Sequence, residues 1–278
     1  MANLAAILNA SRLPPLEARV LAAHALGVER VWISAHENDE INPQAAAEIQ
    51  ALHQRRRAGV PVAYLTGERE FYGLSLAVSP AVLIPRPETE LLVDCAIPLL
   101  REGGRVLDLG AGSGAIGIAI ALNCPSARVF ACEASEAALD IARENAKRHG
   151  AQVSFVKSDW FAAMRGERFN LIVSNPPYIA QCDPHLDEGD LRFEPREALV
   201  AGKDGIECLD AIAAAARDHL LPGGWLLIEH GYDQGQACVA MLNRLGYEQV
   251  DDYKDLSKQP RACLGRWRGV AAFKRSAR

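Results

Sequence analysis

Residues 106–117 read VLDLGAGSGAIG, which predicts a buried strand, a glycine-rich turn and the first turn of a helix. Glycine adopts positive φ angles without strain and lets the backbone approach a ligand closely. The N-terminus of a helix offers free N–H groups to a negative group. The letters from Gly112 to Gly117 also fit G-x-G-x-x-G, a dinucleotide-binding pattern that is weak evidence by itself. We therefore expect a ligand at this turn.

Strand-like apolar runs alternate with helical patterns on both sides of this turn. We expect strands at residues 105–109, 127–132, 153–156, 169–173, 224–229, 247–253 and 261–267, and helices at 115–122, 135–149, 205–220 and 234–245. This alternation is typical of a mainly parallel sheet with helices on both faces. No helix separates the last two strands, so we expect the last strand to be antiparallel. The predicted fold class is α/β, with a doubly wound, Rossmann-like sheet.

The chain before this sheet divides into a helical region and a connector. Residues 1–58 carry apolar side chains at helical spacing, for example Leu16, Val20 and Leu21. Residues 59–84 hold short runs between glycines and prolines, which is typical of a hairpin linker. A helix is predicted from about residue 85 to residue 100, and it opens the larger domain of residues 85–278. The helical domain shows no catalytic constellation, so we expect it to recognise a partner protein.

The composition is that of an ordinary globular protein, with 278 residues, 49% of them hydrophobic and 23% charged. No apolar run reaches the roughly 18 residues of a membrane span, and the first ten residues lack the features of a secretory signal, so we expect a cytoplasmic protein. The net charge of −5 argues against broad binding to nucleic acid. The seven cysteines form no C-x-x-C pair, so we expect neither a disulfide framework nor a metal site.

The predicted strand at residues 169–173 ends in Ser174, Asn175, Pro176, Pro177 and Tyr178. A proline restricts the residue before it to extended backbone and has no N–H to donate. This segment therefore predicts a stiff hydrogen-bond acceptor site at the carboxyl edge of the sheet, where open α/β proteins bind ligands.

Acidic and aromatic residues follow the neighbouring strands at the same edge. Asp108 precedes the first glycine, where its carboxylate can face the positive end of an amino acid, and Glu133 ends the next strand, where it can accept hydrogen bonds from a ribose. Asp159 and Trp160 offer a carboxylate for an exocyclic amine and a flat ring for adenine. A nucleoside with an amino acid tail satisfies all four, so we expect S-adenosyl-L-methionine, with S-adenosyl-L-homocysteine as product. The cofactor residues predicted at this edge are Asp108, Gly110, Ala111, Gly112, Ser113, Gly114, Glu133, Asp159 and Trp160.

At these residues the chain resembles the class I S-adenosylmethionine-dependent methyltransferases, and within them the PrmC/HemK family of protein-(glutamine-N5) methyltransferases. The resemblance extends over nearly the whole chain. Its most specific marks are the sequences PRPETE at residues 85–90 and RFEP at residues 192–195. The ribose acid, often Asp in that family, is Glu133 here. The resemblance implies methylation of a glutamine side-chain nitrogen in the Gly-Gly-Gln motif of class-1 peptide chain release factors, and thus a role in translation termination.

The resemblance also implies that Asn175 contacts the cofactor, together with Gly110, Gly112, Gly114, Glu133 and Trp160. It further implies that Asn175, Pro176, Pro177 and Tyr178 hold the substrate glutamine. As a hypothesis for catalysis, the Asn175 side-chain oxygen and the Pro176 carbonyl accept the two N–H groups of the amide, and Tyr178 stacks on its plane. Two other readings stay open from the residues alone. One is a nucleic-acid amino-methyltransferase of the adenine-N6 type, which shares Asn-Pro-Pro-Tyr. The other is an NAD-dependent dehydrogenase, which rests on the glycine pattern.

Overall fold

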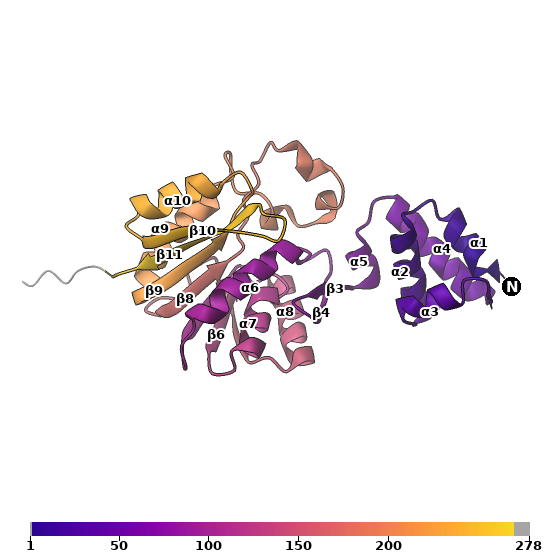
Figure 1. The fold of residues 1–278 in the computed structure, drawn as a ribbon, viewed down its shortest axis with the longest axis horizontal. Coiled ribbons are helices and arrows are strands. Elements are labelled where there is room, and N and C mark those ends of the chain that lie inside the picture. Colours follow the sequence, from indigo (N-terminus) through magenta and orange to yellow (C-terminus); the bar gives the residue numbers. More distant parts are fainter. Residues whose placement is uncertain (1, 270–278) are drawn as a thin grey trace, which may run out of the picture. The chain divides into compact units, whose positions relative to one another are not determined.

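The computed structural model describes residues 2–269 and divides into two compact units (Figure 1). The first unit holds the residues up to Glu68 together with Asp187–Phe193. The second unit holds Arg69–Leu186 and the residues from Glu194 onward. The predicted linker, residues 59–84, is therefore divided between the two units.

The first unit is helical. Its elements are β1 (Ala2–Asn3), α1 (Leu4–Ala10), α2 (Pro15–Leu26), α3 (Arg30–Ala35), β2 (Glu40–Ile41), α4 (Pro43–Arg57) and α5 (Val62–Thr66). Prolines open α2 and α4, where a missing N–H costs no intrahelical bond. The Asn42 side chain accepts the Ala45 N–H and so caps α4. Leu4, Ile33 and Ile49 are fully buried at the centre of this unit.

Arg56 holds the distant segment Asp187–Phe193 on the helical unit. Its Nε donates to Glu17 Oε2 at 2.7 Å, and its Nη1 donates to Asp190 Oδ1 at 2.8 Å. The two carboxylates raise the pKa of Arg56, with the Glu17 hydrogen bond as the largest cause. The Arg192 Nη2 group also donates to the Ala58 carbonyl at 3.3 Å. A segment that follows the strand at Phe169–Ser174 in the sequence therefore packs with the N-terminal helices.

The second unit is built on a seven-stranded sheet with the strand order β10-β11-β9-β8-β5-β6-β7. Its strands are β5 (Arg105–Leu109), β6 (Arg128–Glu133), β7 (Val153–Lys157), β8 (Phe169–Ser174), β9 (Leu220–Glu229), β10 (Glu248–Lys254) and β11 (Pro260–Trp267). β11 is antiparallel to both of its neighbours, whereas β9, β8, β5, β6 and β7 are mutually parallel. The predicted α/β fold with an antiparallel last strand is confirmed.

Helices cover both faces of this sheet (Figure 1). They are α6 (Glu90–Ala96), α7 (Ala115–Asn123), α8 (Glu136–His149), α9 (Glu207–His219) and α10 (Gly235–Arg244). The hairpin of β3 (Glu68–Phe71) and β4 (Leu74–Ala77) begins at the sequence boundary between the units, and short 3-10 helices of the second unit lie at Pro87–Thr89, Ile97–Leu99 and Arg196–Ala198. A 3-10 helix at Pro184–Asp187 ends at the next boundary, and one at Leu191–Phe193 belongs to the first unit. The helix predicted at residues 85–100 is shorter than expected because Pro98 lacks the N–H that would continue α6.

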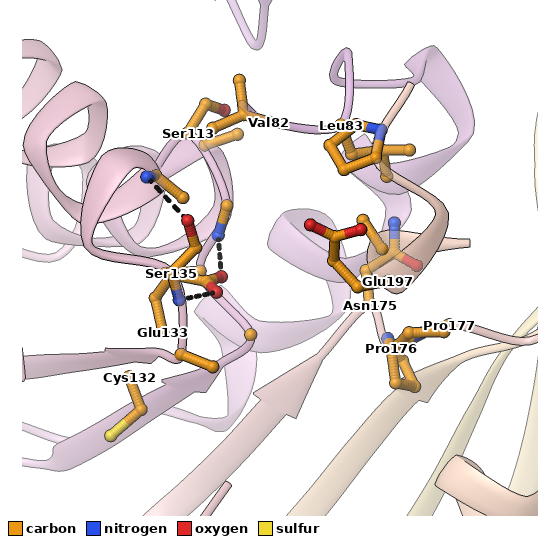
Figure 2. Close-up of a pocket in the computed structure, with 18 of the residues that line it drawn as sticks. Val82, Leu83, Ser113, Cys132, Glu133, Ser135, Asn175, Pro176, Pro177 and Glu197 are labelled. Atoms are coloured by element: carbon orange, nitrogen blue, oxygen red, sulfur yellow. Dashed lines mark hydrogen bonds between the residues drawn. The ribbon is translucent and has the colours of Figure 1, made fainter. Parts of the chain in front are cut away.

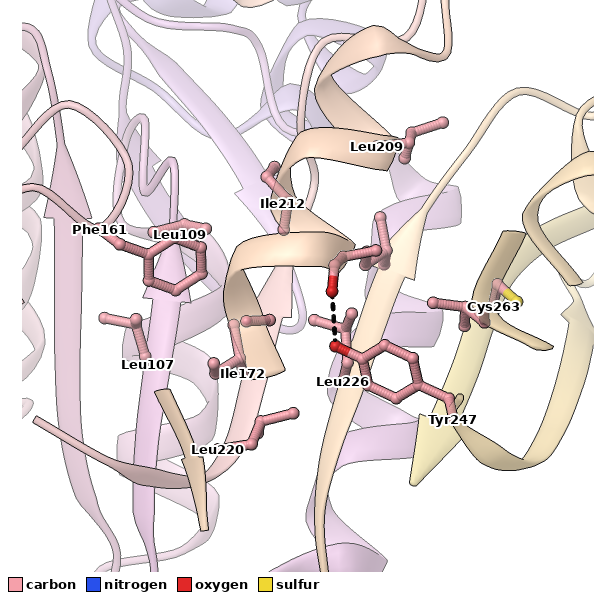
Figure 3. Packing of buried hydrophobic residues seen from close by; sticks show 14 of the residues in the cluster. Leu107, Leu109, Phe161, Ile172, Leu209, Ile212, Leu220, Leu226, Tyr247 and Cys263 are labelled. Atoms are coloured by element: carbon pink, nitrogen blue, oxygen red, sulfur yellow. Dashed lines mark hydrogen bonds between the residues drawn. The ribbon is translucent and has the colours of Figure 1, made fainter. Parts of the chain in front are cut away.

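Side chains of β5 alternate between the two faces. Leu107 and Leu109 belong to the apolar cluster under α9 and α10, with Leu209 and Ile212 of α9 above them (Figure 3). Val106 belongs to the opposite cluster, with residues of α6 and α7. Because successive strand residues point to opposite faces, Asp108 shares the α7 face with Val106.

β5 is the point at which the strand order reverses, since the chain runs from β5 outward to β7 and returns to β8 on the other side of β5. The Ser174 hydroxyl at the end of β8 donates to the Leu109 carbonyl at the end of β5, at 2.6 Å. The segments that follow these two strands therefore begin side by side, at the kind of switch point where α/β proteins bind ligands.

Among residues 2–269, no helix combines the length and the apolar character needed to cross a bilayer.

Substitution of Gly114 by alanine tests how closely the glycine turn packs on the residues beneath it. Its φ of +82° is left-handed, and a Cβ there would lie 2.9 Å from Ile118 Cδ1 and 3.2 Å from Ala142 Cβ. Gly150 is the matched control, because its φ is +69° but a Cβ there meets nothing within 4 Å. We expect Gly150→Ala to lower the free energy of unfolding by about 1 kcal/mol and Gly114→Ala by about 1–3 kcal/mol more. Urea unfolding measures both, and equal losses would contradict the close packing.

Candidate active site

A cavity of about 300 Å³ lies at the carboxyl ends of the parallel strands. Its walls come from the glycine turn after β5, the ends of β6 and β7, the residues after β8, and residues 81–89 and 195–198. Ten of the predicted site residues meet here: Gly110, Ala111, Gly112, Ser113, Glu133, Asp159, Trp160, Asn175, Pro176 and Pro177. The volume lies at the lower end of the usual range for small-molecule sites.

Glu133 lies beside the glycine turn on one side of this cavity (Figure 2). Its Oε2 atom accepts the Gly112 N–H at 2.9 Å, and its Oε1 atom accepts the Ser135 N–H at 3.0 Å. The two hydrogen bonds fix the carboxylate between the β5 turn and the N-terminus of α8, where Ser135 is the capping residue. Each carboxylate oxygen keeps a further lone pair for a ligand.

Asp108 does not line the cavity, although the sequence placed it against the ligand. It is completely buried on the α7 side of β5, and its Oδ2 atom accepts the Gly117 N–H at 2.8 Å. Burial raises the pKa of Asp108 to about 7. The alternation of the strand explains the difference, since the carboxylate supports the turn from behind. Gly114, the N-cap residue of α7, is also absent from the cavity lining.

Trp160 and Asp159 follow β7 and form the side of the cavity near the glycine turn. Trp160 has a positive φ of 45°, and its ring lies close enough to the turn that a Cβ on Gly110 would be 3.6 Å from Cζ3. Ser158 holds this conformation, because its hydroxyl donates to the Trp160 carbonyl and accepts the Ala163 N–H. Asp159 lines the cavity with an exposed carboxylate. The cavity therefore combines an aromatic surface with an anionic acceptor.

Asn175 stands opposite Glu133 in the cavity (Figure 2). Its Nδ2 group donates to Thr89 Oγ1 at 3.1 Å, and Thr89 is buried. This hydrogen bond fixes the orientation of the Asn175 amide. Its Oδ1 atom remains available to accept a hydrogen bond from a ligand. Pro176 and Pro177 line the cavity beside it and contribute no N–H.

Tyr178 is absent from the cavity lining. It packs against the apolar cluster under α9 and α10, and its hydroxyl donates to Glu229 Oε1 at 3.2 Å. Burial raises the pKa of Tyr178 far above that of a free tyrosine. The motif after β8 thus turns Asn175, Pro176 and Pro177 toward the cavity and anchors Tyr178 beside it.

Sequence reasoning from the residues missed two walls of the cavity, Ala81–Thr89 and Pro195–Ala198. They overlap the stretches PRPETE and RFEP, which were noted for their resemblance, and extend beyond them to residues 81–83 and 197–198. The structure joins them, because Glu194 is buried, accepts the Ile84 N–H at 3.0 Å and pairs with the Arg86 guanidinium. Pro195 and Glu197 then reach the cavity, and the Glu197 side chain points into it in Figure 2.

The cavity lining contains several hydrogen-bond acceptors and few side chains suited to proton transfer. Cys132 lines the cavity, but burial raises the pKa of its thiol to about 12. The other ionisable lining residues are the carboxylates Glu133, Asp159 and Glu197. Within residues 2–269, no cluster of three His, Cys, Asp or Glu side chains is suited to a metal ion. The arrangement can hold a cationic or hydroxyl-bearing ligand and orient a group that donates hydrogen bonds.

Comparisons with known proteins agree with this geometry. Residues 2–67 match the PrmC N-terminal domain, and residues 87–188 match the methyltransferase small domain. The chain is 49% identical to a release factor glutamine methyltransferase of Burkholderia pseudomallei, over 96% of this chain and 97% of the relative. It is 42% identical to the protein of that name from Escherichia coli, over 94% and 95%.

Solved structures share the fold at lower identity. A methyltransferase from Pyrococcus furiosus aligns with a TM-score of 0.55 and 24% identity, over 80% of this chain and 98% of that one. A 16S rRNA methyltransferase of T. thermophilus, solved with AdoMet and guanosine, aligns with a TM-score of 0.54 and 20% identity, over 72% and 50%. The full-length identity to curated relatives confirms the resemblance found in the sequence, and the chain belongs to the release factor glutamine methyltransferase family.

Proposed function

We propose that this chain transfers a methyl group from S-adenosyl-L-methionine to the side-chain nitrogen of the glutamine in the Gly-Gly-Gln motif of class-1 release factors. The observation that carries the proposal is the orientation of Asn175 at the cavity wall. Its amide nitrogen is committed to Thr89, so its oxygen remains to accept a hydrogen bond from a substrate N–H.

The cavity fits the nucleoside end of this methyl donor. Glu133 is held by two backbone N–H groups and keeps lone pairs for the ribose hydroxyls. Trp160 offers a ring surface for adenine, and Asp159 offers a carboxylate for its exocyclic amine.

We assign the amino acid end of the donor to a different group from the one expected. Asp108 lies behind the turn, whereas the exposed carboxylate of Glu197 faces the cavity. When bound, S-adenosyl-L-methionine supplies a methyl group on a positively charged sulfur.

The residues after β8 have the properties that an amide nucleophile requires. An amide nitrogen is weakly nucleophilic because its lone pair is delocalised into the carbonyl. Acceptors aligned with its two N–H groups orient it and stabilise the positive charge that develops on the nitrogen. Asn175 Oδ1 and the Pro176 carbonyl are the acceptors that we assign to this task. Tyr178 does not line the cavity, so we assign it the anchoring of this segment and not the stacking on the amide plane that the sequence suggested. A strong base is unnecessary, because a nitrogen that has gained a methyl group loses its proton readily.

We infer that the helical unit recognises the release factor. It carries two exposed apolar side chains, Leu16 at 60% and Val31 at 76% of full exposure. They border a shallow depression together with Arg19 and Arg30. Apolar groups rimmed by charge are typical of surfaces that bind a protein partner.

Asn175→Ala tests the acceptor role. We expect methyl transfer to release factor to fall by at least about a hundredfold, while the affinity for S-adenosyl-L-methionine stays largely intact, because the ribose and adenine groups are unchanged. Radiolabelled methyl transfer and calorimetry measure the two effects. Asn243→Ala, at an exposed site on α10, is the control. A variant at Asn175 with near-normal turnover would remove this residue from the mechanism.

Glu133→Gln tests the cofactor role. Both oxygens of the Glu133 carboxylate accept backbone N–H groups. In the glutamine variant, the side-chain NH₂ group faces one of these N–H groups, so two hydrogen-bond donors oppose each other. We expect the dissociation constant for S-adenosyl-L-methionine to rise roughly tenfold to a hundredfold in calorimetry. Glu144→Gln, exposed on α8, should bind normally. Unchanged binding in Glu133→Gln would show that this carboxylate does not contact the ribose.

Val31→Glu tests the recognition surface. Replacing an exposed apolar contact by a charge should raise the KM for release factor about tenfold or more, with cofactor affinity and melting temperature unchanged. Steady-state kinetics with intact release factor provide the measurement. The control is Glu48→Gln, at an exposed site on α4. Val60 is unsuitable for a control substitution, because its carbonyl accepts a hydrogen bond from Arg56. A normal KM would place recognition elsewhere.

A further inference from the structure

The turn after β9 carries two polar side chains that converge on Tyr178. Glu229 is the last residue of β9, and its Oε1 atom accepts the Tyr178 hydroxyl at 3.2 Å. Gln234 precedes α10, and its Nε2 group donates to the Tyr178 carbonyl at 3.0 Å. One turn of the chain therefore holds both the side chain and the main chain of the same tyrosine.

The amide of Gln234 is fully used in this arrangement. Its Oε1 atom accepts the Gly231 N–H at 2.9 Å, which fixes the direction of the amide. Its Nε2 group also donates to the Gly205 carbonyl at 3.1 Å. Gln234 thus joins the segment after β8, the start of the α9 region and the turn after β9.

Glu229 is an unusual residue to find inside an apolar cluster. Its side chain is buried, and within residues 2–269 its Oε2 atom has no hydrogen-bond partner. Burial raises the pKa of Glu229 to about 7, although the hydroxyls of Thr89 and Tyr178 oppose the rise. A buried carboxylate with an unpaired oxygen costs folding free energy. Glu229 therefore does not stabilise the fold by its own burial, and we look for its role in the groups that it binds, such as the Tyr178 hydroxyl.

Thr89 lies between this carboxylate and the other end of the motif, since its hydroxyl lowers the pKa of Glu229 and accepts the Asn175 Nδ2 group. Glu229 therefore lies behind both Asn175 and Tyr178. Neither Glu229 nor Gln234 lines the cavity itself.

We propose that Glu229 and Gln234 are positioning residues for methyl transfer, which hold the segment Asn175–Tyr178 in the orientation that receives the substrate amide. This inference rests on the proposed function. Because the pair acts through Tyr178 and not on the cavity, its loss changes the rate of transfer and leaves cofactor binding intact.

Gln234→Ala and Glu229→Gln test the proposal in the full-length protein. With saturating S-adenosyl-L-methionine and release factor, we expect kcat to fall roughly tenfold to a hundredfold, with the cofactor dissociation constant unchanged within about twofold. Gln236→Ala is the matched control, because it removes an exposed glutamine two residues along α10. Melting temperatures separate misplacement from unfolding. Gln234 lies outside the buried core, so its variant remains informative even if Glu229→Gln fails to fold.

A double-mutant cycle with Tyr178→Phe distinguishes positioning through Tyr178 from an independent effect. If Glu229 acts through the tyrosine hydroxyl, the double variant of Glu229→Gln and Tyr178→Phe loses no more activity than the more impaired of the two single variants. Multiplied losses, or normal kcat in Gln234→Ala, would overturn this inference while the proposed function stands. A wild-type chain that methylates no release factor would overturn both.

Discussion

The parallel pairing of β5 with β8 is the constraint on which the rest of the site depends. These two strands are neighbours in the sheet although β6 and β7 lie between them in the sequence. The Ser174 hydroxyl fastens the end of β8 to the Leu109 carbonyl of β5. The glycine turn and the Asn-Pro-Pro-Tyr motif consequently leave the sheet at adjacent points. A cofactor turn and a substrate motif placed in this way can present two ligands to each other.

The site works with acceptors held in fixed directions. Asn175 is oriented by Thr89, Glu133 by two backbone N–H groups, and Tyr178 by Glu229 and Gln234. Under the proposed function, each of these groups is therefore oriented by hydrogen bonds within the protein before a ligand binds. This organisation suits a reaction in which orientation and charge stabilisation supply most of the catalysis and proton transfer supplies little.

The sequence predicted the fold well because strand and helix periods are local signals. The eleven elements predicted from residue 105 onward all occur, and the antiparallel placement of β11 followed from the missing helix before it. The prediction that Asp108 contacts the ligand was wrong. The sequence shows that Asp108 precedes the glycines, but it does not show to which face of the sheet the Asp108 side chain points. The Arg86–Glu194 pair joins residues that are far apart in the sequence, so no local pattern indicated it. Glu229 and Gln234 were unnoticed for the same reason.

We propose above all that this site methylates an amide nitrogen of a protein substrate. The most direct measurement is mass spectrometry of a class-1 release factor after incubation with the wild-type chain and S-adenosyl-L-methionine, with peptide fragmentation to locate the modification. We expect one added methyl group, on the glutamine of the Gly-Gly-Gln motif. A release factor that stays unmodified, or that carries the methyl group on another residue, would contradict it.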